Sequence, residues 1–142
     1  MPRTLLAALL ALATFGAAHA QGPNPVPPIA YHQQVLPNGL RVITSLDRTT
    51  PNVTVQVWYG VGAKNDPEGR SGFAHMFEHM MFKATRDLPP EYFDRLTEDV
   101  GGMNNAFTAD DTTAFYEVIP SAHLQRLLWA ESDRMSDRKS VV

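Results

Sequence analysis

One mostly apolar segment organises this chain: Phe73-Ala74-His75-Met76-Phe77-Glu78-His79-Met80-Met81-Phe82. Its two histidines are four residues apart, so on an α-helix both imidazoles project from the same side, with Glu78 beside them. A helix that is otherwise apolar all round is expected to be buried, and each buried polar group without a partner costs about 1–3 kcal/mol. A divalent cation would remove that cost, so we predict that His75 and His79 bind a metal ion. The alternative is a pair of core histidines that hydrogen-bond backbone groups.

Length and composition set limits on the function. The chain has 142 residues, enough for one domain, and its 44% hydrophobic and 19% charged residues are typical of a soluble globular protein. With 12 basic and 15 acidic residues, the formal net charge is −3 and no basic patch is present, so we expect no nucleic acid partner. The chain has no cysteine, so a metal ion must be held by histidine and carboxylate.

The N-terminus has the pattern of a secretory signal peptide. Arg3 precedes the almost wholly apolar stretch Leu5 to Ala18, and Ala18-His19-Ala20 is a small-x-small cleavage site. We expect residues 1–20 to be removed after Ala20, which leaves a secreted or periplasmic protein that does not associate with the membrane. Residues 21–30 are rich in proline and are expected to form an extended linker.

Alternating apolar and polar residues, together with residues typical of turns, predict five strands. Two of them flank the turn Pro37-Asn38-Gly39, because asparagine and glycine tolerate positive φ. A third covers residues 52–59, where apolar and polar side chains alternate, and two more cover 103–108 and 112–119.

Helical spacing and capping residues predict three helices. The motif helix is expected to follow Ser71 as its N-cap, and a second helix to follow Pro89-Pro90. A third is expected to follow Ser121, with Leu127 and Leu128 on its buried face. The order β-β-β-α-α-β-β-α predicts an α+β fold, a two-layer sandwich of a largely antiparallel sheet with helices on one face.

Four segments within residues 31–135 occur in an order and at a spacing that carry a family resemblance. They are Leu36-Pro37-Asn38-Gly39-Leu40-Arg41-Val42, the Gly60-x-Gly62-Ala63-x-x-Asp66 loop, His75-Met76-Phe77-Glu78-His79-Met80-Met81-Phe82-Lys83, and Gly101-Gly102-Met103-Asn104-Asn105-Ala106-Phe107-Thr108. Together they resemble the N-terminal domain of the pitrilysin and insulinase family of zinc peptidases, or inverzincins. Secreted bacterial relatives of the mitochondrial processing peptidase β-subunit look closest. We therefore expect residues 31–136 to be the N-terminal part of a zinc peptidase domain.

The resemblance assigns roles to four residues. It implies that His75 and His79 bind Zn²⁺ and that Glu78 is the carboxylate that activates the metal-bound water. Asn105 matches an asparagine that in the family lies beside the substrate backbone; the other interpretation is a turn or strand-end residue that caps a loop. The substrate would be a peptide or small protein, bound as an added strand along a sheet edge.

The chain also departs from the family pattern. The family's third zinc ligand is a glutamate on a later helix, and none of the glutamates among the 63 residues (142 − 79) after His79 matches it. We expect a second half of the peptidase, or a partner subunit, to close the cleft. Residues 137–142 follow neither the family nor the preceding helical period, and we interpret them as a non-native tail translated from a sequencing adapter; a frameshift or a naturally short protein are the alternatives. On this interpretation the chain is an N-terminal fragment that is inactive alone.

Two functions of different class follow from the sequence. The first is a zinc-dependent endopeptidase, which hydrolyses peptides with a metal-activated water. The alternative is a non-catalytic partner subunit or peptide-binding module of a two-chain peptidase. The presence of Glu78 favours the enzyme, because a subunit without catalysis has no physical reason to place a carboxylate in an apolar helix.

Overall fold

The structure is a computed structural model that describes residues 27–85 and 87–136. The expected signal peptide, most of the proline-rich linker and the tail at 137–142 lie outside these residues. The chain divides into two units, Met1–Leu46 and Asp47–Val142, each of which is described by itself. Within the described ranges, no helix is both long enough and apolar enough to cross a membrane.

The first unit contains a β-hairpin, as the sequence predicts. Strand β1 (His32–Val35) pairs antiparallel with β2 (Arg41–Thr44). Gly39 has a φ of 86°, and Oδ1 of Asn38 accepts a hydrogen bond from the N–H of Leu40 at 3.1 Å. The Asn-Gly pair therefore supplies both the positive φ and the side-chain acceptor that close this turn.

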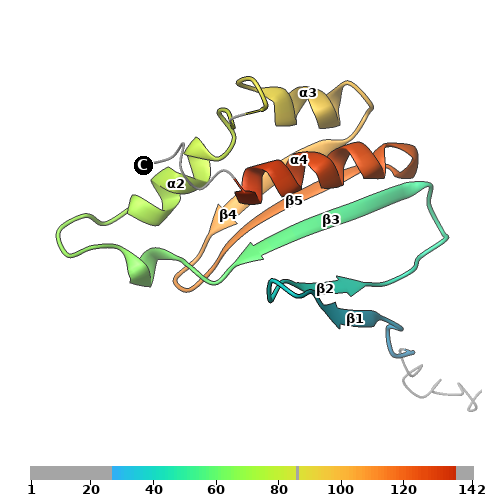
Figure 1. Ribbon diagram of the computed structural model, residues 1–142, viewed down its shortest axis with the longest axis horizontal. Helices are drawn as coiled ribbons and strands as arrows, with labels where there is room; N and C mark the ends of the chain where they lie inside the picture. Colours follow the sequence, from blue (N-terminus) through green and yellow to red (C-terminus); the bar gives the residue numbers. More distant parts are fainter. Residues whose placement is uncertain (1–26, 86, 137–142) are drawn as a thin grey trace, which may run out of the picture. The chain divides into compact units, whose positions relative to one another are not determined.

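The second unit is built on a three-stranded antiparallel sheet (Figure 1). Its strands are β3 (Asn52–Tyr59), β4 (Met103–Thr108) and β5 (Thr113–Pro120), in the order β3-β5-β4. Strand β5 is the most buried because it pairs on both sides. Along β3, intermediate and exposed residues alternate, as the sequence pattern predicts for a strand with one covered face.

Three helices cover one face of this sheet (Figure 1). They are α2 (Phe73–Met80), α3 (Tyr92–Glu98) and α4 (Leu124–Ser136). Two short 3₁₀ helices, η1 (Ala63–Asn65) and η2 (Ser121–His123), precede α2 and α4. The predicted α+β fold, with helices on one face of an antiparallel sheet, is confirmed.

The core lies between the sheet and helices α3 and α4. Its buried members are Leu88, Phe93, Leu96, Ile119, Leu127 and Ala130. The prediction that Leu128 is buried is wrong, since this residue is 49% exposed. It follows the fully buried Leu127 and is turned about 100° around the helix axis, away from the sheet.

A cluster of three charged side chains is also buried in this layer. Arg134 and Glu131 of α4 and Glu117 of β5 are at most 3% exposed. Nη2 of Arg134 lies 2.9 Å from Oε1 of Glu117, and the same guanidinium donates to both oxygens of Glu131. Its carbon lies 4.3 and 4.2 Å from the ring centroids of Phe93 and Phe115. The buried guanidinium is thus held by two carboxyl groups and stacked between two aromatic rings.

Candidate metal and catalytic site

The N-terminus of α2 is held by a carboxylate from the preceding loop. The prediction that Ser71 caps this helix is wrong: the N-cap is Gly72, with a φ of 89°, and it offers no side-chain acceptor. The carboxylate of Asp66 instead accepts hydrogen bonds from the first three N–H groups, those of Gly72, Phe73 and Ala74, at 2.7, 3.2 and 2.8 Å. The hydrogen bond from Ala74 is the largest cause of a lowered pKa of Asp66. Its negative charge also lies at the positive end of the helix.

The loop that carries Asp66 is itself fixed to the end of the β4–β5 hairpin. The N–H of Ala63 donates to the carbonyl of Ala109 at 2.9 Å, and that of Lys64 to the carbonyl of Asp110 at 2.8 Å. Gly62 is required for this approach, because a Cβ there would lie 2.3 Å from the carbonyl oxygen of Ala109. The hairpin end therefore determines where α2 begins.

His75 and His79 face each other across one turn of α2. Their Nε2 atoms are 3.1 Å apart and their ring centroids 4.7 Å apart. Zinc–nitrogen bonds of about 2.0–2.1 Å in tetrahedral geometry place two ligand nitrogens about 3.3 Å apart. The pair therefore fits two corners of a zinc coordination shell. Among the described residues, no group of three or more metal-binding side chains occurs.

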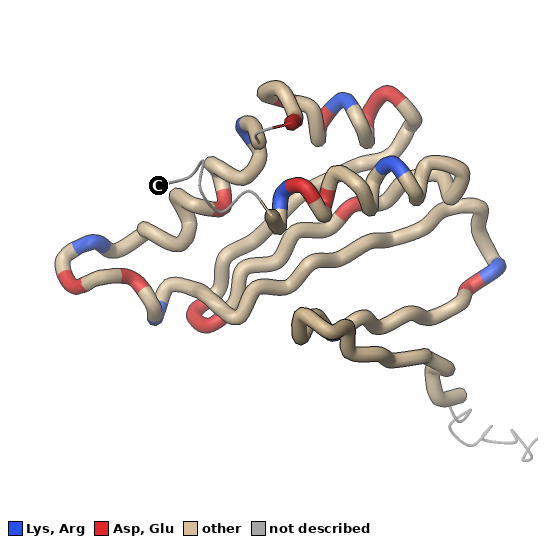
Figure 2. The backbone as a smooth tube through the Cα atoms, viewed as in Figure 1, with Lys and Arg blue, Asp and Glu red and all other residues tan. Residues whose placement is uncertain are grey.

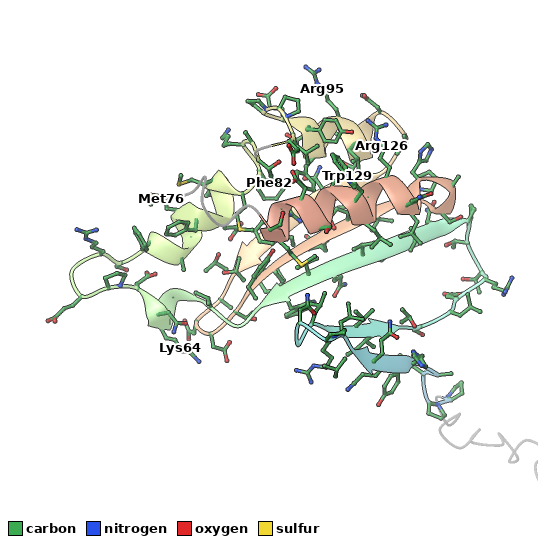
Figure 3. The ribbon with its side chains drawn as sticks, viewed as in Figure 1. Lys64, Met76, Phe82, Arg95, Arg126 and Trp129 are labelled. Carbon is green, nitrogen blue, oxygen red and sulfur yellow. The ribbon has the colours of Figure 1, made fainter. Side chains whose placement is uncertain are left out.

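The expected burial of the motif helix is wrong. Only Ala74 and Glu78 of α2 are buried, whereas both histidines are exposed. Met76, 46% exposed, lies on the outer side of the helix (Figure 3). The imidazoles are thus accessible to a metal ion from solvent, and the case for a metal rests on their mutual geometry instead of on a burial cost.

Glu78 lies on the side of α2 that packs against the sheet. The residue is 7% exposed, and its Oε2 accepts a hydrogen bond of 2.5 Å from Oγ1 of Thr108 on β4. The structure thus anchors the carboxylate of Glu78, which precedes His79 on the same helix, to the sheet. Thr108 closes the segment from Gly101 that carries the family resemblance, but no motif in the sequence assigns a role to its hydroxyl.

Asn105 lies in the middle of β4, so its interpretation as a turn or strand-end residue is wrong. Its exposed side chain accepts, through Oδ1, a hydrogen bond of 2.8 Å from the N–H of Ala106. The hairpin closes with a bond from the N–H of Ala109 to the carbonyl of Thr112 at 2.8 Å. In an antiparallel pair, the backbone groups of successive residues point alternately towards and away from the partner strand. Counted back from the bond of Ala109, the N–H and C=O of Ala106 point away from β5, towards the other edge of β4. Asn105 therefore covers one donor of that edge.

Comparison with known proteins identifies the family. Residues 41–137 match the model of the family described as Insulinase (Peptidase family M16). The match covers more than half of the chain, and so the chain belongs to this family of metallopeptidases.

Relatives and solved structures agree with this assignment. The chain is 39% identical over 120 residues to the zinc protease PqqE of Helicobacter pylori, covering 82% of this chain and 26% of that protein. It is 30% identical over 126 residues to a probable mitochondrial-processing peptidase subunit beta of Arabidopsis thaliana, covering 82% of this chain and 24% of the relative. The chain thus spans about a quarter of the length of these relatives.

Two crystal structures have the same fold over most of the chain. A protease from Helicobacter pylori has a TM-score of 0.71 at 35% identity, over 75% of this chain and 26% of the other. Pitrilysin has a TM-score of 0.71 at 27% identity, over 78% of this chain and 12% of the other.

Proposed function

We propose that the protein containing this chain is a zinc-dependent endopeptidase and that α2 carries part of its catalytic site. The observation that carries the proposal is the Nε2–Nε2 separation of 3.1 Å between His75 and His79, on the helix that also carries the buried carboxylate of Glu78. The names of the relatives, zinc protease and processing peptidase, support the same class of reaction.

Each side chain of the motif has a role in this proposal. His75 and His79 hold the zinc through Nε2 as neutral ligands. Zinc, when bound, polarises the scissile carbonyl and acidifies its water. Glu78 takes the proton from the attacking water and delivers it to the leaving amine. A catalytic zinc site has three protein ligands as a rule, and we propose that the third is a carboxylate from a part of the full-length protein other than the described residues.

The free edge of β4 is the proposed binding site for the peptide substrate. Within the described residues, β4 pairs with β5 alone, and Thr108 at its end touches Glu78. A peptide added antiparallel or parallel to β4 would therefore run towards the carboxylate. Asn105 would release the N–H of Ala106 to such a peptide and could then bind its backbone.

Two proposals concern the rest of the protein. We propose that residues 1–20 direct export and are removed after Ala20, so that the mass of the mature protein corresponds to a start at Gln21. We also propose that a second half of the peptidase, or a partner subunit, closes over β4 and α2. The length of the relatives and their family, in which two-domain and two-subunit enzymes occur, support this arrangement.

The substitution Glu78→Gln tests the proposed reaction in the full-length protein encoded at the source locus. Glutamine keeps the size and an acceptor for Thr108 but cannot take a proton, so hydrolysis of an unstructured peptide should fall by at least about a thousandfold with bound zinc retained. The matched control is Glu98→Gln, an exposed glutamate on α3. Activity of Glu78→Gln within tenfold of wild type would refute the role of Glu78, and a wild-type protein without zinc would support the non-catalytic alternative.

A further inference from the structure

We propose that Thr108 is a positioning residue for Glu78: its hydroxyl fixes Oε2 of the carboxylate and leaves Oε1 to act as the base. The inference rests on the proposed function of Glu78 as a base and adds a second residue to the machinery. Thr108 acts through Glu78, from the strand along which the substrate is proposed to bind.

The hydrogen bond between Thr108 and Glu78 is short, and the carboxylate that accepts it is almost fully buried. Oγ1 of Thr108 and Oε2 of Glu78 are 2.5 Å apart, and Glu78 is 7% exposed. In the ranges that the structure describes, Thr108 is the one side chain that donates a hydrogen bond to this carboxylate. The hydroxyl of Thr108 is the donor and Oε2 of Glu78 the acceptor in this bond.

The number of available hydroxyl hydrogens shows that the hydrogen of Thr108 is used in its bond to Glu78. Thr113 lies directly opposite Thr108 in the β4–β5 pair, and the two Oγ1 atoms are 3.4 Å apart. Oγ1 of Thr113 donates to the carbonyl of Val61 at the shorter distance of 3.0 Å. Each hydroxyl has one hydrogen. The hydrogen of Thr113 is therefore used by Val61, and that of Thr108 is used by Glu78.

A fixed donor matters because the last torsion of a glutamate is soft. Rotation about the bond to the carboxylate has a broad, roughly two-fold profile, so packing alone does not determine which way the two oxygens point. A hydrogen bond to Oε2 selects one orientation and directs Oε1 elsewhere. Pre-orientation of a base lowers the cost of reaching the transition state, so the loss of Thr108 should lower kcat and leave KM unchanged.

The test compares Thr108→Val with Thr108→Ser in the full-length protein. Valine keeps the branched shape and removes the hydroxyl, whereas serine keeps the hydroxyl. We expect Thr108→Val to lower kcat for a peptide substrate about ten- to a hundredfold, with KM and zinc content unchanged, and Thr108→Ser to recover to within about threefold of wild type. Thr54→Val, at an exposed threonine on β3 of the same sheet, is the matched control and should have wild-type kinetics.

Two kinetic results would overturn the proposal: a kcat of Thr108→Val within twofold of wild type, or a Thr108→Ser variant as slow as Thr108→Val. Crystal structures of the wild type and both variants give a readout that does not depend on activity. The Glu78 carboxylate should turn in Thr108→Val and return in Thr108→Ser, and an unchanged orientation in all three would refute positioning by Thr108. Full activity of Glu78→Gln would refute the proposed function instead, and the crystal structures would still decide the role of Thr108.

Discussion

Helices α2 and α4 both place polar side chains one turn apart, but they treat them in opposite ways. On α4, Glu131 and Arg134 are buried and bond to each other and to Glu117. On α2, His75 and His79 are exposed and lie against each other, with Nε2 atoms 3.1 Å apart. Figure 2 shows both signs of charge along α4. The first arrangement pairs polar groups inside the fold, whereas the second leaves two ring nitrogens at the surface of the described residues.

Burial, more than residue type, distinguishes the polar side chains that are part of this core from those that we propose bind a metal ion. A buried ion cluster is costly to break, because removal of one partner leaves charges without compensation. An exposed imidazole pair costs little to form or to lose. We therefore expect the largest change in stability where a buried partner is lost and the smallest where the exposed imidazoles are lost.

The largest effect is expected from Arg134→Met. The substitution keeps much of the side-chain length but leaves the buried carboxyl groups of Glu117 and Glu131 without their cation, so the protein should lose about 3–5 kcal/mol of stability. The midpoint of urea unfolding at pH 7 measures this loss. Arg126→Met is the control on the same helix, where the guanidinium is exposed and bonds to the hydroxyl of Tyr92. Equal losses of stability in the two variants would show that the buried Arg134 contributes no more to stability than the exposed Arg126.

An intermediate effect, dependent on pH, is expected from Glu117→Gln. Burial, helped by the hydrogen bond and the charge of Glu131, raises the pKa of Glu117 from 4.5 to about 9 against the opposing effect of Arg134. The folded state therefore keeps a proton that the unfolded chain releases above pH 4.5. The stabilisation from this proton is complete below the unfolded pKa and is lost as the pH rises towards 9.

Glutamine at this position is neutral at every pH. The wild type should thus lose stability relative to Glu117→Gln between pH 5.5 and 8, by up to about 1.4 kcal/mol per pH unit. Urea midpoints at three pH values give the slope, and Glu98→Gln, at an exposed position, should keep the wild-type slope. Parallel curves for wild type and Glu117→Gln would contradict a protonated Glu117.

The smallest effect on the fold is expected from His75→Ala combined with His79→Ala. Both residues are exposed, so in a chelator the double variant should unfold within about 0.5 kcal/mol of wild type. Added zinc should raise the urea midpoint of the wild type alone, because only the wild type can bind it. A large loss of stability without metal would mean that the imidazoles are part of the core after all.

The sequence predicts the elements of this fold well and their burial less well. The strands and the Pro89-Pro90 helix start follow from alternation, turn residues and backbone restrictions, which are local properties. The exposure of His75 and His79 does not follow, because the apolar residues of α2 suggest a buried helix whereas only Ala74 and Glu78 are buried. Periodicity gives the faces of a helix but not which face the rest of the protein covers.

Contacts between residues that are far apart in the sequence likewise cannot be predicted from it. Asp66 caps α2 across a six-residue separation, and Thr108 bonds Glu78 across 30 residues. Ser71 was the nearest residue of a capping type, and local capping rules consider only adjacent positions. The cluster of Glu117, Glu131 and Arg134 combines a strand and a helix in the same way. Its members look like ordinary surface charges in the sequence.

The hydrogen bond from the N–H of Gly72 to Asp66 has a consequence for how the chain tolerates change. It joins the two ends of the segment 67–71 at 2.7 Å, while the residues before Asp66 are held by the hairpin end. The segment is therefore a closed loop, and the position of α2 does not depend on its length. Insertions or a spectroscopic label placed within 67–71 should leave the two imidazoles where they are, which makes this loop the natural attachment point for a reporter beside the site.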